Sequence, residues 1–377
     1  MTATPDTNKS HSGSKVRVLI VDDSPTVRAV LRSLLAREPR LELVGSATNG
    51  LDALAKIEAL RPDVCTLDIE MPHLDGLDVL ARATGRFPVA FIMISTLTQT
   101  GARITFQALR RGAFDYIPKP ESVLTARDEF AASLIEKVLA AGRAKGRVRP
   151  ELEGGVKIPA PAHNSRGWVV GIGISCGGPQ TLSALLPAFP ADFAPILVTQ
   201  HMPVEFTPMF ARHLDQICAM RVKEAEAGDQ LTPGRILVAP GDAHLCLKRL
   251  GERVYVVLDS GPKVSGHRPS ADAMFASMAA VCAPRCVGLV MTGMGRDGSS
   301  GIVKLRQAGC PTIAQDEATS LVFGMPAAAA ATGCVDRIAP LSKIPQAIVA
   351  MMTPAVRSCE RAGAGASGSA SRWQRLT

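Results

Sequence analysis

The sequence predicts an α/β protein of two doubly wound domains joined by a basic linker. Over residues 16–138, short apolar runs without polar alternation alternate with segments of helical spacing. Such runs are typical of parallel strands buried on both faces. A second series of the same kind begins at Trp168 and extends to about residue 354. Residues 139–166, rich in Gly, Pro and charge, separate the two series as a flexible linker.

Composition and length exclude several other classes of protein. The chain has 377 residues, of which 46% are hydrophobic and 20% charged, as in a soluble globular protein of about two domains. No apolar run approaches the roughly 18 residues of a membrane span, and the polar N-terminus lacks the apolar core of a signal peptide. We therefore expect a cytoplasmic protein without membrane insertion. The nine cysteines are scattered without a C-x-x-C pair, which favours free thiols over disulfides.

The net charge of +8 is concentrated in two segments. Residues 139–166 hold six Lys/Arg against two Glu, and residues 355–377 hold four Arg against one Glu. Both segments are poor in apolar periodicity, as solvated linkers and disordered tails are. The rest of the chain is close to neutral, so we expect no nucleic-acid partner.

The first series predicts five strands alternating with helices, which together form a parallel sheet with helices on both faces. Pro25 marks the start of a first helix, and residues 51–60 and 102–112 continue the helical pattern. The predicted strands are residues 15–23, 41–45, 63–68, 88–96 and 112–117.

Acidic and phosphate-binding residue types gather where these strands end. In a doubly wound sheet, ligands bind beyond the carboxyl ends of the strands. Three carboxylates at one edge would repel one another unless a hard cation such as Mg²⁺ neutralised them. A lysine beside them could pair with a phosphoryl group. The residues at these ends are Asp22, Asp23, Asp68, Ser95, Thr96 and Lys119.

The motifs VDDS, LDIEMPHLDG, IST and KP occur in this order in residues 16–138, which resemble the receiver domain of bacterial response regulators. The resemblance implies a flavodoxin-like fold of five parallel strands. It also implies that Asp68 accepts a phosphoryl group from a histidine kinase and that Mg²⁺ is the cofactor. The implied roles of the remaining residues are Mg²⁺ binding by Asp22, Asp23 and the backbone carbonyl of Glu70, phosphoryl binding by Thr96 and Lys119, and an aromatic switch at Tyr116.

The stretch GIGISCGG, residues 171–178, opens the second series and has two interpretations. Its glycines are typical of a dinucleotide-binding turn. Gly173, Ser175 and Gly177 also form G-x-S-x-G, the elbow that exposes a nucleophilic serine between strand and helix. A nucleotide-binding fold usually ends its second strand with an acidic residue. Here that strand ends in Gln200 and His201, which favours the hydrolase.

A nucleophilic serine needs a histidine base and a carboxylate that orients the base. His201 follows the strand next in sequence and is the first candidate base, with His244 and His267 as alternatives. Asp297 lies in a glycine-rich turn after the strand at residues 288–291 and is the first candidate acid. The alternatives for the acid are Asp242 and Asp272.

Four motifs, G-x-G-x-S-x-G-G, T-Q-H-M-P, G-H-R-P-S-x-D and T-G-M-G-x-D-G, then occur in one order. With them, residues 167–354 resemble the catalytic domain of the protein-glutamate methylesterases of bacterial chemotaxis, the CheB family. The resemblance implies a Ser175, His201 and Asp297 triad, with an oxyanion hole from the backbone N–H groups of Met294 and Cys176. Cys176 stands where the family usually has threonine, and we expect its side chain near the acyl pocket.

The whole chain is thus expected to be a receiver followed by a hydrolase without a cofactor of its own. The resemblance implies that it removes methyl esters from methylated glutamates of chemoreceptors, releasing methanol, and deamidates receptor glutamines. It also implies that the receiver restricts entry to Ser175 until it is phosphorylated. A nicotinamide-binding or DNA-binding output domain remains the alternative at this point.

Overall fold

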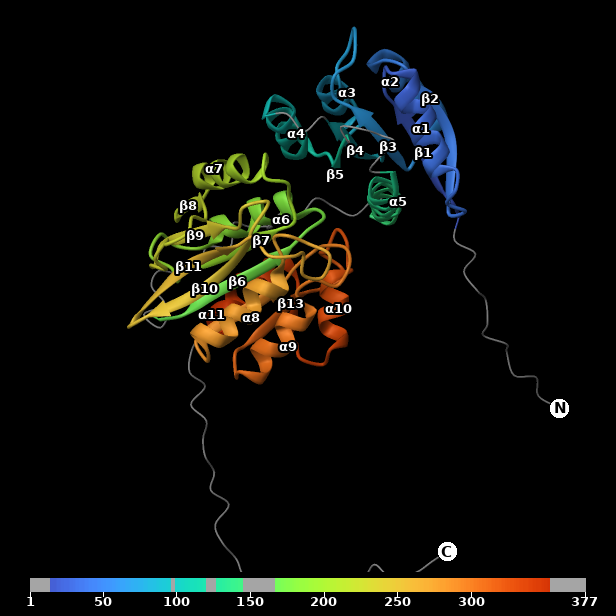
Figure 1. Cartoon of the computed structure of the whole chain (residues 1–377). Helices are drawn as coiled ribbons and strands as arrows, with labels where there is room; N and C mark the ends of the chain where they lie inside the picture. Colours follow the sequence, from blue (N-terminus) through green and yellow to red (C-terminus); the bar gives the residue numbers. More distant parts are fainter. Residues whose placement is uncertain (1–13, 96–98, 120–126, 145–166, 353–377) are drawn as a thin grey trace, which may run out of the picture.

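A computed structural model describes the chain at residues 14–95, 99–119, 127–144 and 167–352 (Figure 1). It has two α/β domains, as the sequence predicts. None of the described helices has the length and apolar character that a membrane crossing needs. The eight cysteines in the described ranges are all free.

The N-terminal domain is built on five parallel strands in the order β2-β1-β3-β4-β5, which confirms the predicted sheet. Helix α1 contacts α5, while α2 contacts α3 and α3 contacts α4, so helices cover both faces. The elements are β1 (Val16–Val21), α1 (Pro25–Leu35), β2 (Leu41–Ala47), α2 (Gly50–Leu60), β3 (Val64–Asp68), α3 (Gly76–Ala83), β4 (Ala90–Ser95), α4 (Gln99–Arg111), β5 (Asp115–Pro118) and α5 (Arg127–Arg143).

Polar caps start the helices that leave the carboxyl edge of this sheet. Ser24 accepts a hydrogen bond from the Val27 N–H, and Pro25 occupies the first turn of α1, where its missing N–H is not needed. Asn49 and Asp75 cap α2 and α3 in the same way. These caps start each helix, and the chain thereby turns away from the edge of the sheet.

Helix α5 continues to Arg143, inside the range predicted as linker from residue 139. The reason is burial: Leu139 and Ala141 pack in the core beneath the sheet, which extends the helix past the predicted boundary. The rest of the predicted linker and the predicted tail lie outside the described residues.

The C-terminal domain is built on seven parallel strands in the order β14-β13-β12-β6-β7-β9-β8. Its first strand, β6, lies between β12 and β7, so the strand order reverses there, and ligands bind at such a switch point. The strands are β6 (Val169–Ile174), β7 (Ile196–Gln200), β8 (Arg221–Glu224), β9 (Arg235–Val238), β12 (Cys286–Val290), β13 (Thr312–Gln315) and β14 (Arg337–Ala339).

An antiparallel hairpin, which the sequence analysis did not anticipate, packs on helix α8 beside the sheet. It consists of β10 (His244–Leu250) and β11 (Arg253–Asp259). The helical elements of the domain are α6 (Gly178–Leu185), η2 (Leu186–Ala188), α7 (Thr207–Ile217), α8 (Ala271–Cys282), α9 (Ser299–Gln307), α10 (Met325–Ala331), η3 (Leu341–Lys343) and α11 (Ile344–Met352).

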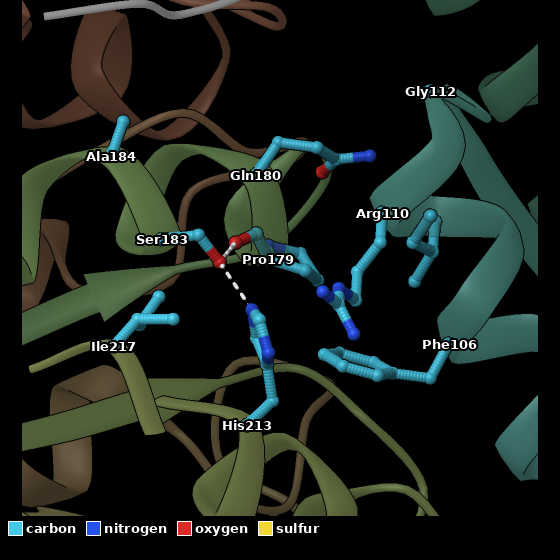
Figure 2. A pocket seen from close by; sticks show the side chains of 10 residues that line it. Phe106, Arg110, Gly112, Pro179, Gln180, Ser183, Ala184, His213 and Ile217 are labelled. Atoms are coloured by element: carbon cyan, nitrogen blue, oxygen red, sulfur yellow. Dashed lines mark hydrogen bonds between the residues drawn. The ribbon is translucent and has the colours of Figure 1, made fainter. Parts of the chain in front are cut away.

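Helix α4 of the first domain packs against α6 and α7 of the second. The Phe106 ring lies 6.0 Å from the Phe210 ring and meets the edge of His213 at 5.1 Å, measured between centroids. The Gln180 side-chain amide donates to the Ala113 carbonyl at 2.7 Å. A cavity of about 300 Å³ lies beside these contacts, with Phe106 and Arg110 on one side and Ser183 and His213 on the other (Figure 2).

Candidate active site and acidic pocket

Ser175 occupies a sharp turn between β6 and α6, as predicted. Its N–H donates to the Thr292 carbonyl at 3.0 Å, and its own carbonyl accepts from the Gly178 N–H at 2.8 Å. Gly177 has φ +74°, in the left-handed region that favours glycine. A Cβ at Gly177 would also lie 2.4 Å from the Leu321 side chain. Glycine at position 177 is therefore required by both backbone conformation and packing.

Gln200, the last residue of β7, connects the turn of Ser175 to His201. Its side-chain amide donates to the Ser175 carbonyl at 2.9 Å and to the His201 carbonyl at 3.1 Å. The His201 N–H in turn donates to the Ile174 carbonyl at 3.2 Å. These bonds fix the backbones of the candidate nucleophile and base relative to each other, at the ends of two adjacent strands.

His201 and Asp297 meet directly, with 2.7 Å between His201 Nε2 and Asp297 Oδ2. The other ring nitrogen of His201, Nδ1, is buried and has no hydrogen-bond partner among the described residues. Because Nε2 is engaged by the acid, Nδ1 is the ring nitrogen left to accept a proton.

Asp297 is fully buried at the N-terminus of α8. It accepts hydrogen bonds from the Ser270 hydroxyl at 2.6 Å and from the backbone N–H groups of Ala271 at 2.7 Å and Asp272 at 3.1 Å. Burial alone would raise the pKa of Asp297, but the hydrogen bonds from His201, Ser270 and Ala271 outweigh it and hold this pKa at about 2. The carboxylate stays ionised where the helix dipole also favours negative charge.

The alternative residues have other contacts. His244 uses both ring nitrogens, one accepting from the Ser270 N–H at 3.2 Å and the other donating to the Pro262 carbonyl at 3.1 Å, so it has a structural role. Asp272 accepts from the Ser265 hydroxyl and the Gly301 N–H, both at 2.6 Å, and Asp242 is exposed. His267 stacks on the His201 ring, with 3.8 Å between centroids.

The backbone N–H groups of Cys176 and Met294 follow β6 and β12, the two strands at the switch point. Neither donates a hydrogen bond to another described residue. The Thr292 hydroxyl joins their two loops, because it donates to the Cys176 carbonyl and accepts from the Val322 N–H, both at 2.9 Å. Two unpaired donors are thus held beside Ser175.

The Cys176 side chain is turned toward the first domain, and its expected place near the acyl pocket stays a prediction. Its thiol donates to Asp115 Oδ2 of that domain at 2.6 Å. The side chain is buried, and burial together with the Asp115 charge raises the pKa of the thiol well above its ordinary value. Contact between the domains fixes this orientation.

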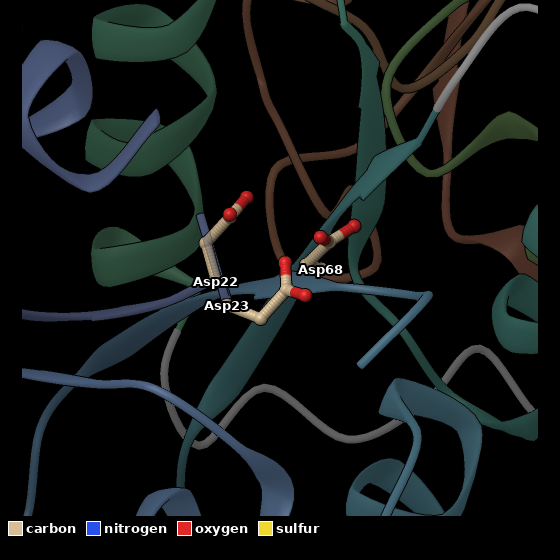
Figure 3. Close-up of side chains that lie close together, drawn as sticks. All are labelled: Asp22, Asp23 and Asp68. Atoms are coloured by element: carbon tan, nitrogen blue, oxygen red, sulfur yellow. The ribbon is translucent and has the colours of Figure 1, made fainter. Parts of the chain in front are cut away.

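At the carboxyl edge of the first sheet, Asp22, Asp23 and Asp68 each offer an oxygen, and the three atoms lie within 4.8 Å of one another (Figure 3). Lys119 Nζ lies 2.7 Å from Asp68 Oδ2 and 3.1 Å from Asp22 Oδ2. Burial and the Asp22 charge raise the pKa of Asp68 to about 6, although Lys119 opposes this. Glu70 follows strand β3, which ends at Asp68, and is exposed, whereas Thr96 lies outside the described residues.

Tyr116, in strand β5, lies on the domain interface. Its ring stacks on Phe206, with 4.6 Å between centroids and 17° between planes, and Lys137 Nζ lies 5.1 Å from its centroid. Phe206 belongs to the loop that follows His201. The predicted switch residue therefore contacts the segment that carries the candidate base.

Comparison with known proteins identifies the families of both domains. Residues 170–348 match the CheB methylesterase family and residues 18–128 the response regulator receiver domain. The protein-glutamate methylesterase/protein-glutamine glutaminase of Pyrococcus abyssi is 44% identical over 349 residues, 90% of this chain and 94% of that protein. The chain belongs to the CheB methylesterase family.

Two further relatives with the same description support that assignment. The protein of Pyrococcus horikoshii is 44% identical over 89% of this chain and 94% of its own length. One from Koribacter versatilis is 42% identical over 89% of this chain and 95% of its own. As a family member, the chain is a hydrolase with a receiver domain, and neither a nicotinamide-binding nor a DNA-binding output domain is supported.

Three contributors to the site were not predicted from the sequence. Gln200 was noted only as the end of a strand, and Ser270 only within the motif G-H-R-P-S-x-D. Asp115 carried no signal at all, because its contact with Cys176 exists only when the domains are docked. The position of Gln200, a polar residue at the end of a buried strand, was the one feature of the sequence that could have indicated its place in the site.

Proposed function

We propose that Ser175, His201 and Asp297 are the catalytic triad with which this methylesterase hydrolyses methyl esters of glutamate side chains. The observation that carries the proposal is the 2.7 Å contact between His201 Nε2 and a buried, ionised Asp297, at the end of the strand adjacent to Ser175. The Asp297 carboxylate fixes the tautomer with the proton on Nε2, so Nδ1 is the base. The roles of the two ring nitrogens are thereby exchanged relative to the serine-protease arrangement.

In the first half-reaction, Ser175 Oγ attacks the ester carbonyl carbon while His201 Nδ1 takes the serine proton. The N–H groups of Cys176 and Met294 stabilise the resulting oxyanion, a contribution that is typically worth about 2.7–4 kcal/mol per donor. As the C–O bond to the methoxy group breaks, His201 returns its proton and methanol leaves. Water then attacks the acyl-enzyme by the reverse proton transfers and releases glutamate.

The same acyl-enzyme forms from a glutamine side chain, with ammonia as the leaving group in place of methanol. We therefore propose that this chain shares the glutaminase activity named for its relatives. Its substrates are proposed to be the methylated cytoplasmic helices of chemoreceptors, and the enzyme is proposed to act in the cytoplasm.

The first domain is proposed to be phosphorylated on Asp68 by a histidine kinase. The proposed fit to Mg²⁺ rests on three carboxylates, which are hard ligands, at one edge of the sheet. The negative charge of Asp22 helps to raise the pKa of Asp68, and a cation would relieve this repulsion. Asp22, Asp23, Asp68 and the Glu70 carbonyl would hold the ion, whose charge would offset that of the incoming phosphoryl group. Lys119 pairs with the phosphoryl oxygens, and Thr96 is proposed to bind one of them.

The domain interface suggests how phosphorylation reaches the triad. Tyr116 and Asp115 of strand β5 contact the loop after His201 and the residue after Ser175. An inward movement of Tyr116 on phosphorylation would break its stack with Phe206. The equilibrium would then shift from the form in which the two domains are docked to the undocked form. The docked form would be the inactive one.

Release of methanol from a methylated receptor fragment, with and without acetyl phosphate, tests the function. Wild-type chain should release methanol faster with the phosphodonor, whereas Ser175→Ala should lose all but a trace of turnover while remaining folded and phosphorylated. Substantial turnover in Ser175→Ala would contradict the proposal.

A further inference from the structure

His267 presents a flat ring to His201, and this contact has no part in the triad chemistry just described. The two imidazole rings lie 3.8 Å apart between centroids, with only 12° between their planes. Asp297 holds His201 at one ring edge, through Nε2, which leaves the ring free to swing about that bond. A face-to-face contact removes this freedom.

The loop that carries His267 is fixed on both sides of the ring. His267 and Val264 exchange two backbone hydrogen bonds, each 3.0 Å long. The hydroxyl of Ser265 donates to Asp272 Oδ2 on α8 at 2.6 Å, and Arg268 donates to the carbonyls of Ser260 and Gly261. The backbone that carries the ring is therefore held in place by the protein.

The same loop ends in Ser270, whose hydroxyl donates to Asp297 Oδ1. The same loop thus contacts the face of the His201 ring through His267 and the Oδ1 atom of Asp297 through Ser270. The side chain of His201 is only 9% exposed, and the His267 ring is part of what excludes water from it.

His267 is neutral at working pH. Burial and the charges of His201 and Lys263 lower its pKa to about 4, although Asp297 opposes this. The His267 ring therefore adds no positive charge beside His201 when His201 takes the serine proton.

We propose that His267 is a positioning residue of the methylesterase, which holds the His201 ring in the plane where Nε2 meets Asp297 and Nδ1 is left to act as the base. This inference rests on the triad proposed above. It assigns His267 a role in kcat through His201, with no contact to substrate and no proton transfer of its own.

The test compares His267→Ala with His267→Phe in the full chain, phosphorylated with acetyl phosphate and Mg²⁺. The alanine variant should lose about tenfold in kcat for methanol release, with KM within twofold of wild type. Phenylalanine restores a flat face, so its kcat should stay within threefold of wild type, and its pH profile between pH 6 and 8 should be unchanged. Lys263→Ala, a change of charge on the same loop, is the matched control and should behave as wild type.

A second readout follows the base directly. The proton between His201 Nε2 and Asp297 gives a downfield resonance, which is assigned by its loss in Asp297→Asn. This resonance should broaden in His267→Ala and persist in His267→Phe, and circular dichroism confirms the fold of each variant. Equal kcat in wild type and His267→Ala, or equal impairment of the alanine and phenylalanine variants, would overturn the inference. Turnover in Ser175→Ala would instead overturn the triad on which it rests.

Discussion

The thiol of Cys176 lies 2.6 Å from the carboxylate of Asp115, and this contact joins the residue after the nucleophile to strand β5 of the receiver. Asp115 is also 3.3 Å from Lys137 Nζ and accepts from the Tyr116 N–H at 2.8 Å. Because the Cys176 N–H is a proposed oxyanion donor, this contact connects the receiver directly to the proposed catalytic machinery.

Cys176→Ala should weaken docking of the receiver and raise basal methylesterase activity. A hydrogen bond to a charged group is worth about 1.5–3 kcal/mol, but Asp115 keeps Lys137 as a partner in the variant. We therefore expect basal methylesterase activity to rise about three- to tenfold. Stimulation by acetyl phosphate should shrink by the same factor. The measurement is methanol release by the unphosphorylated and phosphorylated full chain.

The matched control is Cys246→Ala, which removes a thiol from the hairpin remote from the interface and should change neither rate. Asp115→Asn should act like Cys176→Ala, and the double variant should add little to either. Unchanged basal activity in both single variants would show that the contact does not stabilise the docked form.

Asp297→Asn should abolish most of the activity and also destabilise the fold. An amide cannot accept all of the bonds from Ser270, Ala271 and Asp272, and leaving such groups unpaired costs about 1–3 kcal/mol. It also favours the wrong tautomer of His201, a change worth about 10⁴ in kcat where it has been measured in a serine protease. Asp242→Asn, at an exposed carboxylate, should match wild type in methanol release and in thermal unfolding.

His267→Phe should make the catalytic domain more resistant to mild acid. The unfolded chain protonates His267 near pH 6.5, whereas the folded chain does so only near pH 4. The unfolded state therefore binds more protons between these values, and stability rises with pH across that window. The free energy of unfolding of the phenylalanine variant minus that of wild type should therefore be about 1–2 kcal/mol larger at pH 5 than at pH 7.

Urea unfolding of the catalytic domain at pH 5 and pH 7 measures this gain. If the free energy of unfolding changes between pH 5 and pH 7 by the same amount in His267→Phe as in wild type, His267 is not buried in its neutral form. Lys263→Ala keeps the ring but removes a charge that lowers the pKa of His267, so its stability difference between the two pH values should be slightly smaller than that of wild type.

Binding of Mg²⁺ to the acidic pocket should weaken as the pH falls. Burial and the Asp22 charge raise the pKa of Asp68 to about 6, so a proton competes with the ion below that value. A pKa of 6 predicts a loss of about tenfold in apparent affinity between pH 7 and pH 5, which calorimetric titration of the full chain can measure. Asp68→Asn should bind more weakly and lose this pH dependence, and a flat profile in wild type would contradict the prediction.

The strands and the acidic residues at their ends were predictable, since both rest on local patterns. The residues Val18 to Val21 are consecutive and buried, and Asp22 follows them directly, so the edge of the sheet is visible in the sequence. The base was less certain, because His201, His244 and His267 all gather near Asp297. Only the hydrogen bonds of His244 and the stacking of His267 separate them.

Features that depend on contacts between domains were not predictable. The direction of the Cys176 side chain is set by Asp115, which lies 61 positions away and in another domain. The extension of α5 past residue 139 depends on a core that Leu139 reaches only in three dimensions. Neither has a local signature in the sequence.

A fragment of residues 167–354 should have higher basal methylesterase activity than the unphosphorylated full chain and should not respond to acetyl phosphate. The reason is that docking holds Phe106 against Phe210, Tyr116 against Phe206 and Asp115 against Cys176, on the side of the domain where Ser175 and His201 lie. Removing the receiver removes all three contacts, and each 1.4 kcal/mol of docking free energy changes the open to closed ratio tenfold. Both proteins should be compared at equal concentration in methanol release, with folding checked by circular dichroism. A folded fragment no faster than the unphosphorylated full chain would rule out simple occlusion, and the contact from Asp115 to Cys176 would then be the route by which phosphorylation activates the oxyanion hole directly.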